Sequence, residues 1–315
     1  MEKPSLARQT TFGSLLAGLA LFGSLATAAP AQAAAARHAN RTAAHAVRAH
    51  PGRHRGAAHH RESRTRHRAH GDDPELPAMR VATGAGFDSC VAPPLASLQA
   101  WHDGSAYRTV GIYIGGRNRA CVGGNLTPSW VTGATAQGWS LIPVYVGLQA
   151  PCVTQKGMAT MQPAQAAQEG TDEADDASAQ ARAYGLASGS PVYFDLEAFK
   201  ANNPSCVSVV LAYIDAWTRE LHVEGYYSGV YGSAASGITT LAQAVQSQPS
   251  FTGPDAIWIA RWDQQARTSD GSVPGNLWPE HQRIKQFQGG HPEKHAGITL
   301  VVDSDYVDGP VAIVS

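Results

Sequence analysis

The acidic pair Asp195 and Glu197 is the part of this sequence best suited to chemistry. It ends an apolar run over residues 191–197, and residues two apart in a β-strand point to the same face. Two carboxyl groups held that close repel each other when both are ionised, so one keeps its proton more readily than the other. One group can then donate a proton while its neighbour stabilises a developing positive charge. Cleavage of a glycosidic bond requires that combination.

An acidic pair also has other uses. The two carboxylates could cap a helix, or bind a metal ion together with Asp303 in a metal-dependent hydrolase. Other catalytic signatures are missing, because the sequence contains no G-x-S-x-G elbow, no H-E-x-x-H helix and no G-x-x-x-x-G-K-[ST] phosphate loop. We therefore expect carboxylate chemistry without a cofactor or a resident metal.

The elements that must position the pair follow a regular alternation. From residue 81 onward, short β-branched or aromatic runs alternate with longer Ala-rich or amphipathic stretches. Most of the short runs are nearly continuous in apolar residues, as expected for strands that are covered on both faces. The predicted strands are Gly84–Asp88, Thr109–Ile114, Ser140–Val146, Pro191–Glu197, Gly225–Val230, Ala256–Ala260, Arg283–Gln288 and Thr299–Asp303. The predicted helices include Ser129–Gln137, Ala164–Ala187, Ser205–Leu221 and Ser233–Gln248.

This alternation predicts an α/β fold, a single TIM-type (β/α)8 barrel in which some irregularity is allowed. Eight βα units in about 240 residues match the size of such a barrel. A doubly wound open sheet is the alternative, but the Gly-rich nucleotide fingerprint that it often carries is missing. In a barrel, the carboxyl ends of the strands build the reactive face. The residues predicted there are Asp88, Asp195, Glu197, Tyr231, Asp263, Gln286, Gln288, Asp303 and Asp305.

Composition divides the chain into three parts. Residues 1–33 are predicted to be a signal peptide, since a short basic start precedes a small apolar segment and an A-x-A cleavage site lies at residues 31–33. Residues 34–75 hold nine Arg and eight His but almost no large apolar side chains, which predicts a disordered linker. Residues 76–315 are predicted to form the barrel domain.

Charge is distributed unevenly along the chain. From residue 71 onward, 13 Lys and Arg stand against 23 Asp and Glu, and an acidic body argues against nucleic-acid binding. No long apolar run follows the signal, so no membrane contact is expected after its cleavage. The basic linker either binds anionic wall polymers or acts as a plain spacer. These features predict a secreted, cell-wall-associated protein.

Four cysteines follow the first four predicted strands: Cys90, Cys121, Cys152 and Cys206. In an exported chain an even number favours two disulfides, and the sequence leaves all three pairings open. Because the four residues follow neighbouring strand ends, the bridges are expected to brace the loops of one rim.

The motifs resemble, in their order, those of secreted bacterial glycoside-hydrolase-like domains of unknown function, which are related to the family 25 lysozymes. The resemblance covers residues 82–310. The segments that carry it are 86–88, 111–113, 193–197, 225–231, 258–262, 285–288 and 302–305.

The resemblance implies a function and a set of site residues. Lysozymes of family 25 cleave the β-1,4 bond between N-acetylmuramic acid and N-acetylglucosamine. By resemblance, Glu197 is the general acid/base, Asp195 stabilises the reacting N-acetyl group or the cationic transition state, and Asp88 and Asp303 complete the acidic floor. Substrate contacts are expected from the aromatic side chains of Tyr113, Tyr231, Trp262 and Phe287 and from Asp263, Gln286 and Asp305.

Two departures from the lysozyme pattern concern the ends of the barrel. The first strand continues Asp88-Ser89-Cys90 where the lysozymes carry an Asp-Val-Ser-x-Tyr/Trp-Gln-like run. The last strand offers both Asp303 and Asp305, and the sequence does not tell which points inward. Two functions follow: a secreted glycosidase that acts on peptidoglycan or a related wall glycan, and a barrel that binds such a glycan without cutting it.

Overall fold

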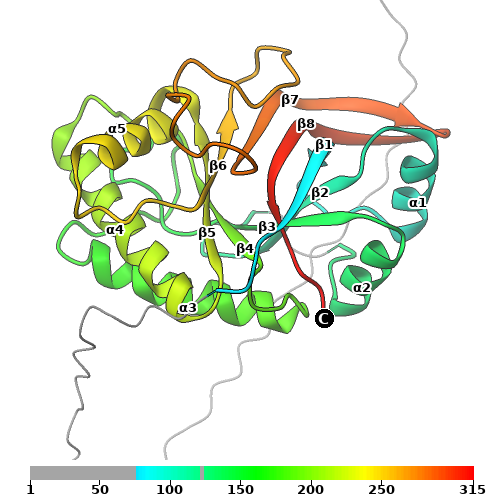
Figure 1. Ribbon diagram of the computed structural model, residues 1–315, viewed down its shortest axis with the longest axis horizontal. Coiled ribbons are helices and arrows are strands. Elements are labelled where there is room, and N and C mark those ends of the chain that lie inside the picture. The colour runs from blue at the N-terminus through cyan, green and yellow to red at the C-terminus, as the bar shows by residue number, and fades with distance from the viewer. Residues whose placement is uncertain (1–75, 121–123) are drawn as a thin grey trace, which may run out of the picture. The chain divides into compact units, whose positions relative to one another are not determined.

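The computed structural model describes residues 76–120 and 124–315, and its eight strands close into a barrel. The strands follow one another around the barrel in chain order, and the helices pack outside them (Figure 1). The predicted single TIM-type α/β barrel is confirmed. The expected signal peptide (1–33), the expected linker (34–75) and Cys121 lie outside the described residues.

All eight predicted strands are present. The strands are β1 (Arg80–Asp88), β2 (Thr109–Gly115), β3 (Ser140–Tyr145), β4 (Pro191–Leu196), β5 (Tyr227–Ser233), β6 (Ala256–Ala260), β7 (Arg283–His295) and β8 (Ile298–Val311). The helices are α1 (Leu95–Gly104), α2 (Pro128–Ala136), α3 (Ala166–Ala183), α4 (Pro204–Val223), the π-helical turn η1 (Ala234–Ile238) and α5 (Thr239–Ser247).

The last two strands depart from the predicted repeat. β8 is antiparallel to both β7 and β1, and within the described part of the barrel the other strand pairs are parallel. No described helix separates β6, β7 and β8, so the expectation of eight βα units is wrong for this part of the chain. Ala296 and Gly297 alone join β7 to β8, with φ of +45° and +84°. Two consecutive positive φ values suit a two-residue hairpin turn, whereas a parallel crossover needs about a dozen residues or more.

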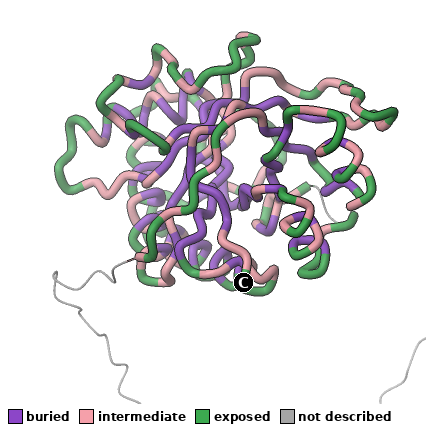
Figure 2. Tube along the Cα trace, turned by 45° about the vertical axis from the view of Figure 1, so that its right-hand side comes forward, coloured by how far each residue is buried: buried purple, intermediate pink, exposed green. Residues whose placement is uncertain are grey.

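Two apolar clusters hold the barrel together, one on each face of its sheet. Inside the barrel, Val144, Tyr193, Trp258 and Val307 pack together, and outside it a larger cluster fills the space between strands and helices. The buried strands form the centre of the trace (Figure 2). Burial of apolar surface stabilises a fold by about 25 cal/mol per Å². Because side chains fill the interior of the barrel, a ligand site within the barrel is expected at the rim.

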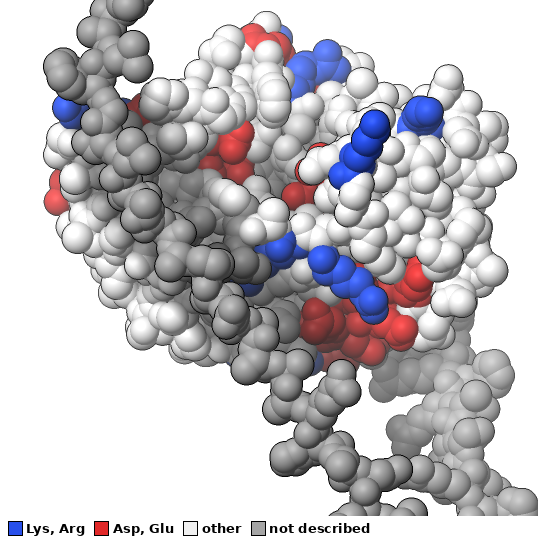
Figure 3. Space-filling view, turned by 180° about the vertical axis from the view of Figure 1, so that it is seen from behind, with Lys and Arg blue, Asp and Glu red and all other residues white. Residues whose placement is uncertain are grey.

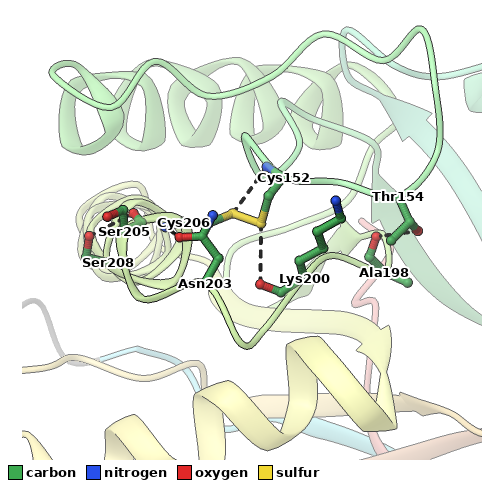
Figure 4. Close-up of a disulfide and its surroundings, with 8 residues drawn as sticks. All are labelled: Cys152, Thr154, Ala198, Lys200, Asn203, Ser205, Cys206 and Ser208. Carbon is green, nitrogen blue, oxygen red and sulfur yellow. Dashed lines mark hydrogen bonds between the residues drawn. A yellow bond between two sulfur atoms is a disulfide. The ribbon is translucent and has the colours of Figure 1, made fainter.

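A disulfide between Cys152 and Cys206 joins the loop after β3 to the first turn of α4 (Figure 4). The backbone N–H of Cys206 also donates to the side chain of Asn203, which caps the helix at 3.2 Å. This bridge braces two neighbouring loops of one rim, as the cysteine positions predicted.

Removal of this bridge by the double substitution Cys152→Ser and Cys206→Ser should destabilise the fold. The two residues are 54 positions apart, and closure of a loop of that length in the unfolded chain corresponds to about 4 kcal/mol. Denaturant titration of the oxidised wild type and the double variant measures this difference in the free energy of unfolding. A difference below about 1 kcal/mol would show that the bridge does not stabilise the barrel.

The outer face of α3 and α4 carries part of the negative charge that the composition predicted. Its exposed or half-buried acids are Asp172, Asp175, Asp176, Glu220 and Glu224. Seen from behind, Asp and Glu side chains gather along the lower edge of the molecule (Figure 3). Within residues 76–120 and 124–315, no helix has both the length and the apolar character that a membrane crossing requires.

Candidate active site

Strands β1 and β8 place three aspartates on the inner face of the barrel. Asp88 lies opposite Asp303, and Gly86 lies opposite Asp305. Directly opposed residues of antiparallel strands share a face, so both Asp303 and Asp305 point to the side of Asp88. Because β8 runs against the other strands, Asp303 lies at the rim and is half-buried, whereas Asp305 is deeper and buried. The choice between the two aspartates that the sequence left open is thus settled: both point inward.

The end of β4 is held in place by a buried glutamine. Asp195 lies on the inner face of β4, and Glu197 is the first residue after the strand. The side chain of Gln149 donates to the backbone oxygen of Asp195 at 2.7 Å and accepts from the backbone N–H of Glu197 at 2.9 Å. Gln149 therefore fixes the backbone on both sides of Leu196. Gln149 was not among the predicted site residues, although a lone amide side chain shortly after an apolar strand was a usable signal.

One hydrogen-bond network joins four of the predicted site residues to Asp88. The hydroxyl of Tyr113 donates to Asp88 Oδ1, and Nε2 of Gln286 donates to Asp88 Oδ2, both at 2.8 Å. The amide oxygen of Gln286 in turn accepts from the Tyr231 hydroxyl and from Nε1 of Trp262, both at 2.9 Å. The network orients the Gln286 amide, because its two ends have partners of opposite character.

Gly111 and Trp258 shape the floor around the aspartates. Gly111 pairs with Asp88 on the neighbouring strand, and a Cβ at position 111 would lie 2.6 Å from the Asp88 Cβ and 3.1 Å from the Trp258 ring. Only glycine leaves room for both side chains. Trp258 Nε1 donates to Asp305 Oδ1 at 2.9 Å. Trp258 was not among the predicted site residues, because an aromatic residue inside an apolar strand has the same pattern as ordinary core.

A cavity of about 340 Å³ opens beside Glu197, within the size range of about 300–1,000 Å³ that is typical of ligand pockets. Its lining consists of Leu196, Glu197, Ala198, Tyr231, Ser233, Ala260 and Trp262. Trp262 is 65% exposed, and Glu197 is half-buried. Of the four predicted catalytic acids, Glu197 alone lines this cavity, while Asp88 and Asp195 are buried more deeply.

Burial controls the protonation of the β4 pair. Desolvation, followed by the charges of Glu197 and Asp88, raises the pKa of Asp195 well above its usual range. Desolvation also raises the pKa of Glu197, against a smaller opposing effect of the backbone N–H of Ala198. Among the described residues, Oδ1 of Asp195 is buried without a hydrogen-bond partner. The pair therefore holds a proton to a higher pH than free carboxylic acids do.

Of the predicted substrate contacts, Tyr231 and Trp262 line the cavity, and the other five do not: Tyr113, Asp263, Gln286, Phe287 and Asp305. Asp263 accepts a hydrogen bond from Nζ of Lys285 at 2.7 Å, and Gln286 and Asp305 are buried.

The rim acids also do not form a compact metal site. In the described part of the chain, the group of acids that brings one oxygen each within 4.8 Å of one another is a different one, on α3 and α4: Asp175, Glu220 and Glu224. Asp195, Glu197 and Asp303 do not meet that spacing.

Substitution of Asp88 by Asn should change how stability depends on pH. Burial and the charge of Asp303 raise the pKa of Asp88 to about 7, against the opposing hydrogen bonds from Gln286 and Tyr113. The folded state thus binds a proton that the unfolded chain releases near pH 4, so wild-type stability falls as pH rises from about 4 to 7. The slope for one such proton is about 1.4 kcal/mol per pH unit.

We expect Asp88→Asn to lose this slope, because its side chain does not titrate. At pH 4 the variant should be the less stable protein by about 1–3 kcal/mol, because its amide N–H₂ faces the donor on Gln286. Urea titrations of both proteins from pH 4 to 7 measure the two effects. Parallel stability curves would contradict the assignment of the raised pKa to Asp88.

Comparison with known proteins places the sequence in a family. Residues 99–307 match the family described as Rv2525c-like, glycoside hydrolase-like domain. The Tat-secreted protein Rv2525c of Mycobacterium tuberculosis, solved with L-tartrate, is 16% identical, with a TM-score of 0.49 over 72% of this chain and 96% of that chain.

Two other solved structures are similar to this chain. The catalytic domain of endolysin ply40 from bacteriophage P40 of Listeria monocytogenes is 15% identical, with a TM-score of 0.43 over 71% of this chain and 93% of its own. The muramidase from Acremonium alcalophilum is 18% identical, with a TM-score of 0.42 over the same two shares. No curated protein sequence matches the chain. The family match spans more than half of the chain, which therefore belongs to the Rv2525c-like, glycoside hydrolase-like domain family.

Proposed function

We propose that the protein is a secreted glycosidase that cleaves β-1,4 bonds of peptidoglycan or a related cell-wall glycan. The observation that carries the proposal is the position of Glu197. Its half-buried carboxyl group has a raised pKa and lines a cavity together with the exposed indole of Trp262. A carboxylic acid that keeps its proton to a higher pH than usual, beside a surface for a sugar ring, suits a general acid.

In the proposed reaction, Glu197 transfers its proton to the glycosidic oxygen as the bond to the anomeric carbon breaks. The sugar that keeps the anomeric carbon becomes positively charged, and the electron pair of the broken bond stays with the leaving oxygen. Water then adds to the anomeric carbon, and the carboxylate of Glu197 takes up the proton that this water releases. Glu197 thus ends the cycle in its starting state.

Asp195 is proposed to stabilise the cation electrostatically. The pKa is raised at both carboxyl groups of the β4 pair. When Glu197 gives its proton to the leaving oxygen, the pair gains negative charge next to the positive charge that develops on the sugar. Asp88 and Asp303 are proposed to keep this end of the barrel acidic, and Tyr113 and Tyr231 to orient the groups around them through Asp88 and Gln286.

Secretion and the wall as partner belong to the same proposal. A signal peptide over residues 1–33 would export the chain, and the basic linker over residues 34–75 would hold it near anionic wall polymers. Rv2525c, to which the chain is similar, is described as Tat-secreted, and two of the other similar proteins are an endolysin domain and a muramidase.

Incubation of the purified protein with insoluble peptidoglycan tests the proposal. Cleavage predicts that reducing ends appear in the supernatant with time, in proportion to enzyme concentration. Protein that sediments with the glycan but releases no reducing ends would favour the binding barrel instead.

A further inference from the structure

The connection between β6 and β7 has no helix and is held by charged side chains instead. Arg283 and Lys285 alternate on β7 with the inward-facing Ile284 and Gln286, so they point out of the barrel, where a βα unit would place a helix. Arg283 donates to the backbone oxygens of Pro274, Leu277 and Trp278. The later part of this connection, drawn in orange in Figure 1, is thereby tied to the outer face of β7.

Lys285 holds the first part of the same connection. Its ammonium group lies 2.7 Å from Asp263 Oδ2 and 3.6 Å from Asp270 Oδ2, and Asp270 also pairs with Arg261 at 2.8 Å. The side chains of Lys285 and Asp270 are almost completely buried. A buried ammonium group is stable only with partners, so these contacts restrict the backbone on both sides of position 262.

Trp262 lies between Arg261 and Asp263, and two further contacts, with Gln286 and Gly289, hold its indole ring. Its Nε1 donates to Gln286 at 2.9 Å. Its ring packs directly on Gly289, since a Cβ at that position would lie 2.5–2.7 Å from three atoms of the ring. The ring nevertheless stays largely exposed and lines the cavity beside Glu197.

We propose that Lys285 and Gly289 are positioning residues for the substrate. Lys285 acts through Asp263 and Asp270, and Gly289 acts by close packing. Together they hold the indole of Trp262 in place as a platform on which one pyranose ring of the glycan packs. The less polar face of the sugar packs on the ring face that Gly289 leaves free. This inference rests on the proposed function for the identity of the ligand. It assigns to Asp263 a role in holding the platform rather than in contacting the sugar.

Adjacent glycines provide a matched test of the platform. In Gly289→Ala the new methyl group must displace the indole, whereas a Cβ at Gly290 meets no atom within 4 Å. We expect Gly289→Ala to raise the Kd for soluble peptidoglycan fragments about tenfold and Gly290→Ala to leave it unchanged. In the full chain labelled with 5-fluorotryptophan, the ¹⁹F resonance that Trp262→Phe removes should shift in Gly289→Ala but not in Gly290→Ala.

The role of Lys285 is tested through Asp263, because Lys285→Met would leave Asp270 charged and buried. Asp263→Asn weakens the 2.7 Å contact and should shift or broaden the same Trp262 resonance, and raise Kd or KM while kcat stays unchanged. An unmoved resonance in Asp263→Asn would overturn the role of Lys285. Equal behaviour of the two glycine variants would overturn the platform.

The binding measurement separates this inference from the proposed function. If the wild type binds the fragments without cleaving them, the proposed catalysis fails, and the comparison of the glycine variants still decides on the platform. If the wild type does not bind glycan at all, the platform is overturned together with the function.

Discussion

Glu197→Gln is expected to lower kcat on peptidoglycan by about 10²- to 10⁴-fold, the usual contribution of general acid/base catalysis. The amide has nearly the shape of the acid but no proton to give, so KM should change little. The fold should remain intact, because Glu197 lies after the end of β4 and its backbone N–H keeps the bond to Gln149. Steady-state kinetics with circular dichroism of the same sample measures both properties.

Glu220→Gln provides the control for this substitution. Glu220 is another partly buried acid with a raised pKa, chiefly through desolvation, but it lies on α4 outside the barrel. We expect this variant to retain wild-type kcat. Equal activity of both variants would show that Glu197 does not act as the acid.

Asp195→Asn is expected to raise the stability of the fold at pH 7 and to lower the activity. The carboxyl group of Asp195 is buried, and one of its oxygens has no hydrogen-bond partner in the described part of the structure. Because its folded-state pKa is raised, wild-type stability falls as pH rises above the unfolded value near 4. The neutral Asn removes that cost, so at pH 7 the variant should be more stable by about 1–3 kcal/mol.

The same variant should lose activity by about 10²- to 10³-fold, because the charge that stabilises the cation is gone. Thermal unfolding at pH 4 and at pH 7, together with kcat at pH 7, tests the combination. The stability gain should shrink towards pH 4, where both proteins carry a neutral side chain. A variant that is less stable than the wild type at pH 7 would contradict the claim that Asp195 lowers the stability of the fold for the sake of activity.

The contrast with Asp88 follows from its partners. Both oxygens of Asp88 accept hydrogen bonds, whereas Asp195 makes no comparable contacts through its side chain. An uncharged replacement therefore loses interactions at Asp88 and loses almost none at Asp195. The pKa is raised at both sites, but at pH 4 the Asp88 variant should be less stable than the wild type, whereas the Asp195 variant should match it.

The strands could be predicted from the sequence because each is an apolar run bounded by turn residues. Five strands begin at the predicted residue: Thr109, Ser140, Pro191, Ala256 and Arg283. The β5 prediction began two residues early, at Gly225, which belongs to the turn after α4. Local periodicity finds a strand reliably but places its ends less well.

The direction of β8 could not be predicted in the same way. An apolar run has the same pattern whichever way the strand runs, and the direction is set by the turn at Ala296 and Gly297. The error in strand direction does not move Asp303 away from the acidic end of the barrel, because antiparallel pairing places Asp303 opposite Asp88. Parallel and antiparallel arrangements differ in which residue of β8 reaches the rim.

The supporting residues of the site were the hardest to predict. Gln149 and Trp258 act through contacts with segments far away in the sequence, so their partners cannot be recognised from their neighbours in the chain. Asp263 had the pattern of a rim acid, but its partner Lys285 could be recognised only once β7 was in place. Residue type and strand position predict candidate acids, whereas partners depend on the packed fold.

Mass spectrometry of peptidoglycan digested by the wild type and by Glu197→Gln tests the central claim most directly. We expect wild-type digests, after borohydride reduction, to contain muropeptides that end in reduced N-acetylmuramic acid, and the variant digests to lack them. Products that end in reduced N-acetylglucosamine would assign the cut to the other β-1,4 bond. Identical digests from both proteins, or intact glycan strands after wild-type treatment, would contradict cleavage by Glu197.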